Sequence, residues 1–308
     1  MELFRALGSL IEAPVAEHRG IAEALDLPAV PDAAVHGAVV GFQRYPYASV
    51  YLGPEGMMGG EARDRVAGFV RALGITGDGA GPAGDERGPT GDARADAREP
   101  DHLASLLGLL AALDQWERDE RDGARRTLLG QARVALVWEH VASWTGPYLA
   151  SFDGCGNPFY EEWAALLGAA LSEATGIMEF PDYLPAALRS APVLADPRRE
   201  GGPAFISALL APARSGVIIL RDDLVRLGDE VGLACRAGER RYVLNSFFAQ
   251  DPAGTLRWLA SHAGRWGARV GAGVQGVGGM GVVAGWWAGR ARSTAALLAE
   301  LADEAVAA

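Results

Sequence analysis

The sequence contains no lysine, and this absence removes several kinds of chemistry at once. All 28 basic residues other than histidine are arginine, so no Schiff base, lysine nucleophile or Walker-type phosphate loop can form. Cysteine is almost as scarce, since only Cys155 and Cys235 occur and neither belongs to a CxxC pair. A zinc or iron–sulfur site built on thiolates is therefore excluded, and we expect a reducing compartment.

Signatures of other catalytic sites are also missing. The five histidines form no HExxH motif and no pair at metal-ligand spacing on a helix face. The sequence has no GxSxG elbow and no SxxK motif. Two formal GxGxxG matches within 271–281 lack the preceding strand that a dinucleotide site needs. We therefore predict no metal, no cofactor and no catalytic residue.

Basic charge is outweighed by acidic charge. The 28 arginines face 39 Asp and Glu residues, which gives a net charge of −11 and a pI near 5.0. This balance argues against nucleic acid and against anionic membranes as partners, and it suits a basic peptide. The first 20 residues carry Glu2, Arg5, Glu12 and Glu17, which interrupt any signal-peptide core, so we expect a cytoplasmic protein.

Apolar residues recur at helical spacing along most of the chain. Two helix starts are marked, by Asn157 followed by Pro158 and by Pro100 followed by Asp101. The pattern predicts an all-α protein with a single short strand allowed over 217–220. Apolar stripes run through three strong helices: Leu103, Leu106, Leu107, Leu110 and Leu113; Val137, Val141, Trp144 and Tyr148; and Phe159, Trp163, Leu166, Leu167 and Ala170.

Composition divides the chain into four parts. We predict an N-terminal helical part over 1–73, a mobile loop over 74–98, a central helical core over 99–200 and a C-terminal extension over 201–308. Within the extension, 270–289 is long enough to span a membrane, but its eight glycines favour a loosely packed surface segment. Its small-residue face of Gly281, Gly285 and Gly289 suggests close packing.

Three groups of residues, in this order, resemble a known family. The first is the segment 45–52 (YPYASVYL), which lies before the predicted loop. The second is Glu99-Pro100-Asp101-His102, which follows the loop. The third is Trp138, His140 and Trp144, which belong to an H-x-x-x-W helix. Over about 35–175 the set is similar to the TorD/DmsD/NarJ chaperones of molybdoenzyme maturation. One departure is that Ser105 and Leu106 stand where the family often has an acidic residue.

The resemblance implies an all-helical bundle of the TorD type with a mostly helical C-terminal extension. It implies a cytoplasmic chaperone, monomeric or dimeric and not an enzyme, for the catalytic subunit of a molybdopterin oxidoreductase of the DMSO reductase class. Such a chaperone would bind the client's N-terminal segment, often a twin-arginine signal peptide, and assist cofactor insertion before export. We expect an apolar trough bordered by acid, formed by Glu99, Pro100, Asp101, His102, Tyr47, Tyr51, Trp138, His140 and Trp144.

Two other functions stay open at this point. A small helical enzyme could use His102 or His140 as a general base beside Asp101. An acidic helical scaffold could bind some other partner.

Overall fold

The structure is a computed structural model that describes residues 2–74, 99–272 and 278–307. Within these ranges the backbone is helical or loop and contains no strand, so the predicted all-α class is confirmed. The predicted mobile loop over 74–98 lies, apart from Gly74, outside the described residues.

The helices that precede residue 200 make up the first group. They are α1 (Glu2–Ser9), α2 (Glu17–Ala24), α3 (Ala33–His36), α4 (Ala48–Leu52), α5 (Gly60–Ala72), α6 (Leu103–Asp119), α7 (Gly123–Ala135), α8 (Ala142–Ala150), α9 (Pro158–Gly176) and α10 (Ala186–Ser190), with α11 (Pro197–Glu200) at the boundary. Two π-helical turns join neighbours, η1 (Gly37–Gly41) after α3 and η3 (Leu136–Val141) between α7 and α8.

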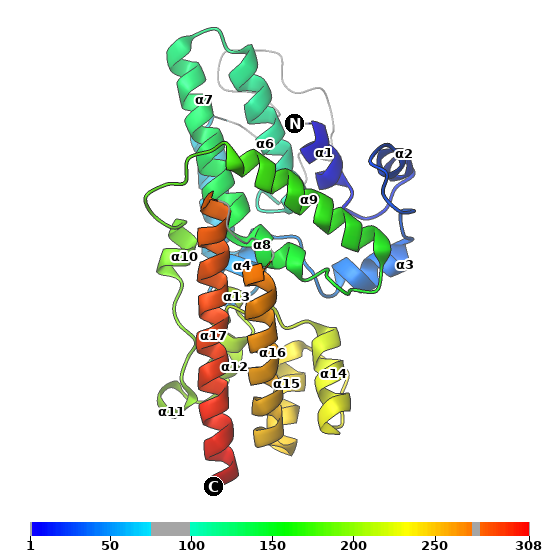
Figure 1. Cartoon of the computed structure of the whole chain (residues 1–308), viewed down its shortest axis with the longest axis vertical. Helices are drawn as coiled ribbons and strands as arrows, with labels where there is room; N and C mark the ends of the chain where they lie inside the picture. The colour runs from blue at the N-terminus through cyan, green and yellow to red at the C-terminus, as the bar shows by residue number, and fades with distance from the viewer. Residues whose placement is uncertain (1, 75–98, 273–277, 308) are drawn as a thin grey trace.

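The C-terminal group contains α12 (Gly202–Leu209), α13 (Pro212–Ser215), α14 (Arg221–Val231), α15 (Arg240–Gln250), α16 (Pro252–Ala272) and α17 (Gly278–Ala307). Figure 1 shows α6 and α7 at one end of the long axis and α14 and α15 toward the other. The α16–α17 hairpin runs along that axis, and α17 contacts α8, α9, α13 and α16. The two groups of helices therefore share one continuous apolar core.

A proline inside α8 explains one of the contacts between the two groups. Pro147 has no N–H, so it cannot bond to the carbonyl of Ser143 four residues earlier. Trp287 of α17 supplies the missing donor, because its indole N–H lies 2.9 Å from that carbonyl oxygen. The indole is fully buried, so this bond both satisfies α8 and fixes α17 against it.

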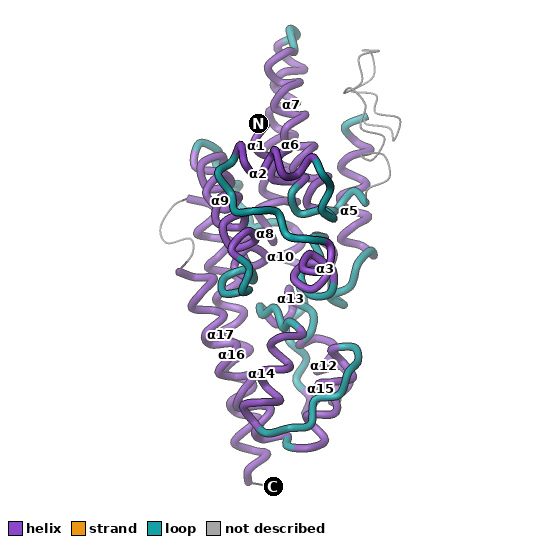
Figure 2. Tube along the Cα trace, turned by 90° about the vertical axis from the view of Figure 1, so that its right-hand side faces the viewer, coloured by secondary structure: helices purple, strands orange, loops and turns teal. Residues whose placement is uncertain are grey.

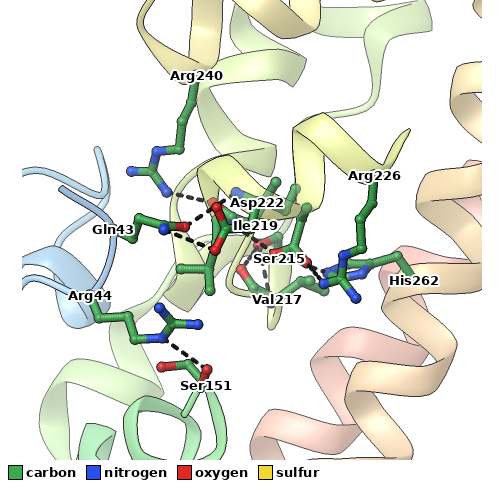
Figure 3. Close-up of polar contacts among 12 residues, drawn as sticks. Gln43, Arg44, Ser151, Ser215, Val217, Ile219, Asp222, Arg226, Arg240 and His262 are labelled. Atoms are coloured by element: carbon green, nitrogen blue, oxygen red, sulfur yellow. Dashed lines mark hydrogen bonds and ion pairs between the residues drawn. The ribbon is translucent and has the colours of Figure 1, made fainter. Parts of the chain in front are cut away.

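The run over 217–220 is buried and has no regular secondary structure, so the short strand allowed by its sequence is not formed. Side chains take the place of a partner strand, as Figure 3 shows for Arg240 at Ile219 and for Ser215 at Val217. The Asp223 carboxylate accepts from Leu220 N at 2.7 Å, and the Arg240 guanidinium donates to Ile219 O at 2.8 Å. The Ser215 hydroxyl donates to Val217 O and accepts from Val217 N, at 3.2 Å each. The segment is apolar enough to be buried, and these polar side chains form hydrogen bonds with its backbone N–H and C=O groups.

The glycine-rich region was predicted to be loosely packed, and this prediction is wrong for its described parts. Residues 270–272 end α16 and residues 278–289 begin α17, where Met280, Val283 and Trp287 are buried. The close packing predicted for the face of Gly281, Gly285 and Gly289 is not found at Gly285, where no atom lies within 4 Å of a Cβ position. It occurs instead at Gly279, where a Cβ would lie 2.6 Å from the Trp138 ring. No described helix is long and apolar enough to cross a membrane.

Candidate functional site

Asp101 forms the cap of a helix that is distant in sequence. Helix α4 begins after Tyr47, whose side chain gives no capping hydrogen bond. The Asp101 carboxylate accepts from Ser49 N at 3.0 Å, and the Asp101 carbonyl accepts from Ala48 N at 2.9 Å. Asp101 is only 1% exposed, so its charge meets the positive end of α4 and a buried N–H that has lost water.

His102 performs the same task for the next helix. It is the N-cap of α6, and its Nδ1 accepts from Ala104 N at 3.1 Å. The sequence placed the start of this helix at Pro100, but the helix begins at Leu103 because His102 is the residue whose side chain caps it. The backbones of Tyr47 and His102 form an isolated bridge, and their rings meet edge to face at 4.9 Å. Tyr47 and residues 99–102, hereafter the corner, thus join the starts of α4 and α6.

The exposed side of the corner is acidic and aromatic. Tyr47 is half-buried, and its pKa is raised by burial and by the charges of Asp101, Glu99 and Glu12. Glu99 remains 53% exposed and pairs with Arg63 of α5 at 2.6 Å, while Pro100 is partly buried. The corner therefore presents to solvent the half-buried ring of Tyr47 and one carboxylate, that of Glu99, and these are groups that attract a guanidinium group.

The other predicted rings lie in the core. Tyr51 and Trp144 stack at 5.1 Å and 11°, and Tyr148 packs against both. Tyr51 is 2% exposed and Trp144 is fully buried. The Trp144 indole N–H donates to the carbonyl of His140 at 2.8 Å, within the same helical stretch. The stacked rings of Tyr51 and Trp144 hold α8 against α4.

Trp138 and His140 both lie in η3 but are covered by different elements. Trp138 meets Phe180 edge to face at 4.9 Å, donates to the carbonyl of Glu179 and lies beside Gly279 of α17. His140 lies 4.9 Å from the ring of Phe69 in α5. Burial, followed by the charge of Arg65, lowers the pKa of His140 to about 4, so its imidazole is neutral at pH 7.

The predicted trough is therefore only partly open in this structure. The corner reaches solvent through Glu99 and Tyr47, whereas Tyr51, Trp138 and Trp144 are core residues. Spacing had indicated which rings share a helix face, and the structure shows that α5, α17 and the 177–180 loop cover those faces. The roles of these residues in binding stay a prediction.

Two residues that were not among the predicted site residues, Ser49 and Arg44, complete the local structure. Ser49 is fully buried, and its hydroxyl accepts from Gly59 N at 3.1 Å just before α5. Arg44 is buried and donates to the carbonyls of Ser151 and Val39, with its guanidinium over Phe152. The only feature of the sequence that could have pointed to Arg44 is its position directly before the 45–52 segment.

One polar contact links the start of this region to the C-terminal helices. Gln43 donates to the Asp222 carboxylate at 2.9 Å and accepts from Asp222 N at 3.2 Å, as Figure 3 shows. Because 179 positions separate the two residues, no local pattern could reveal this pair.

The geometry gives no support to general-base chemistry at Asp101 and His102. Each uses its side chain to accept from a backbone N–H, and both are buried. In the part of the chain that the structure describes, no group of three or more His, Cys, Asp or Glu side chains could hold a metal ion. The arrangement is suited to positioning helices and to attracting cations.

Comparison with known proteins identifies the section that contains these residues. Residues 43–150 match the family model described as nitrate reductase delta subunit. The match includes the 45–52 segment, the corner and the H-x-x-x-W helix, so the resemblance seen in the sequence is confirmed. No curated protein and no solved structure matches the chain.

Proposed function

Because residues 43–150 match a family of molybdoenzyme maturation chaperones, we propose that this protein binds the N-terminal segment of a molybdopterin oxidoreductase catalytic subunit. The client is of the DMSO reductase class, and the chaperone assists its cofactor insertion in the cytoplasm before export. The family is a chaperone family and not a catalytic one.

The observation that carries the proposal is the half-buried ring of Tyr47 at the corner, together with the exposed carboxylate of Glu99. A twin-arginine segment has adjacent cations followed by an apolar stretch, and its arginines require a face of this kind. Glu99 is the exposed acid at the corner, so it is the side chain that would meet a client arginine. Asp101 and His102 shape the corner by holding the starts of α4 and α6 together.

Charge supports the encounter over longer distances. The chain carries a net charge of −11, so a cationic peptide is attracted before contact, and this attraction weakens as salt rises. We expect affinity to fall between low salt and 0.5 M salt.

The test is isothermal titration with the N-terminal peptide of a molybdoenzyme encoded beside this gene. In the Arg63→Ala background, where the ion pair between Arg63 and Glu99 is absent, Glu99→Gln should weaken binding by about two- to fivefold, which is the range for an exposed ion pair. Glu55→Gln removes one exposed carboxylate from a turn outside the corner and controls for net charge. A peptide with both arginines replaced by glutamine should bind weakly to every variant.

Three outcomes would contradict the proposal. Unchanged affinity in both Asp101→Ala and His102→Ala would remove these two residues from the site. Equal binding of the arginine and glutamine peptides would remove the acidic face. Copurification that yields no molybdoenzyme subunit would favour the scaffold alternative.

A further inference from the structure

Helix α5 covers the predicted binding surface from the outside. Figure 2 shows it at the outer edge of the molecule. Its inner face contains Ala62 and Val66, both buried, and Phe69, which lies 4.9 Å from His140. Val70 and Leu73 continue this face and pack on the core. The apolar side of α5 therefore occupies the space over α4 and η3.

The beginning of α5 is held to the corner at two points. Arg63 donates from Nε to the Glu99 carboxylate at 2.6 Å. Gly59 N donates to Ser49 Oγ, and Ser49 N in turn donates to Asp101. An arginine of this chain thus already pairs with the exposed acid of the corner.

The order of these residues along α5 matches that of the proposed client. Arg63 comes first and meets the acid, and the apolar face of Val66 and Phe69 follows over the aromatic core. A client segment with arginines followed by apolar residues would require both surfaces in that order. We propose that α5 occupies the client's docking surface and must be displaced when the client binds; this inference rests on the function proposed above.

The chain around α5 allows such a displacement. Gly56 is fixed, because a Cβ at this position would lie 2.6 Å from the carbonyl of Leu210. Gly59 and Gly60 have φ values of +89° and +69°, and no atom lies within 4 Å of their Cβ positions. Glycine adopts many backbone conformations at little cost, so α5 can rotate about these two residues while the preceding turn stays packed.

Displacement would uncover the part of the predicted trough that α5 covers, whereas Trp138 would stay under α17 and the 177–180 loop. When α5 leaves, the ring of His140 loses its cover of Phe69, and Glu99 loses Arg63. If only a fraction of the molecules has the site open, the apparent affinity equals the affinity of the open site multiplied by that fraction. Weakening the contacts of α5 should therefore strengthen client binding.

Two substitutions test the sign of this effect by titration with the client peptide. Arg63→Ala should strengthen binding by about two- to fivefold, because it breaks one exposed ion pair. Its control is Arg65→Ala, which removes the same charge from α5 but breaks a pair within the helix, with Glu61. Val66→Ala should strengthen binding by about fivefold or more, because it weakens the buried face of α5. Its control is the same substitution at the buried Val243 of α15.

Hydrogen exchange on the unmodified protein gives an independent result. Adding saturating client peptide should increase deuterium uptake in 60–72, whereas uptake in α16 should stay the same. Uptake in α5 that stays constant or falls would overturn the inference, and so would weaker binding of Val66→Ala.

The outcomes separate the two proposals. If the peptide binds and Arg63→Ala, Val66→Ala and their controls all have equal affinity, the proposed function stands and the displacement of α5 is refuted. If the peptide binds to none of the variants, the proposed function itself fails, and the inference fails with it.

Discussion

Replacing Asp101 by alanine should destabilise the protein, and the structure gives the size of the effect. The substitution removes the acceptor of Ser49 N in a region where Asp101 is 1% exposed and Ser49 is fully buried. A buried N–H left without an acceptor costs about 1–3 kcal/mol. We expect the free energy of unfolding to fall by about 2–3 kcal/mol, near the upper end, because the lost acceptor is charged and lies at a helix start.

Two further variants separate the contributions of burial and charge. Asp122 caps α7 in the same way, accepting from Arg125 N at 2.8 Å, but it is exposed. Water can replace that acceptor, so Asp122→Ala should cost only about 0.5–1 kcal/mol. Asp101→Asn keeps an acceptor oxygen and loses the charge, so we expect its cost to lie between those of the two alanine variants.

Equilibrium unfolding in urea, followed by tryptophan fluorescence, measures all three variants at one pH. Trp144 stacks on Tyr51 of the capped helix, so the signal reports on this region. If Asp101→Ala costs no more than Asp122→Ala, the buried cap does not stabilise α4 and the reasoning is wrong.

Two other predictions concern packing and pH. Gly216→Ala should lower the free energy of unfolding by about 2–4 kcal/mol, because φ is +73° and the new Cβ would lie 2.4 Å from Ala291 N. The control is Gly232→Ala in the same urea assay. It should cost only about 1–2 kcal/mol, because φ is +76° but no atom lies within 4 Å of the Cβ position. Because the pKa of His140 is lowered to about 4 from 6.5, the unfolded state binds more protons between these values, and stability should fall by up to about 3 kcal/mol from pH 6.5 to 4. His140→Asn should show a smaller fall over that range, and an unchanged pH profile would show that His140 is not buried in its neutral form.

Much of the helical structure followed from local signals. Asn157 and Pro158 predicted the start of α9, and Asn157 Oδ1 accepts from Tyr160 N as an N-cap does. The apolar stripe from Leu103 onward predicted α6, which is buried along that face. Caps and stripes act within a few residues, so they can be read without knowledge of the fold.

The corner could be predicted only in part. Asp101 looked like a charge at the start of its own helix, but it caps α4, whose Ser49 lies 52 positions away. A carboxylate that precedes one helix can cap any helix start that the fold brings near it, and sequence spacing carries no information on that choice. The resemblance to a family singled out Asp101 and His102 as candidate site residues, and the structure was needed to find their hydrogen-bond partners.

The exposure of the rings could not be predicted either. Helical spacing placed Tyr148 and Trp144 on one face, but a face reaches solvent only if no other element covers it. The stripe of Val66 and Phe69 in α5 was visible in the sequence, whereas the surface it packs on was not. The strand allowed over 217–220 was not predicted correctly for a related reason. The composition of this run favours a strand, but side chains such as Asp223 supply the hydrogen bonds to its backbone that a partner strand would supply.

The contacts of α17 have a consequence for the order in which the protein is completed during synthesis. Trp287 satisfies the carbonyl of Ser143, and Gly279 lies against Trp138, yet α17 begins at Gly278, about 130 residues after the matched family section ends. At ~5–20 residues per second, the ribosome needs about 6–26 s to make that stretch. During this interval the carbonyl of Ser143 and the ring of Trp138 are without these neighbours. A newly made chain therefore completes the packing around η3 and α8 only after α17 has emerged from the ribosome.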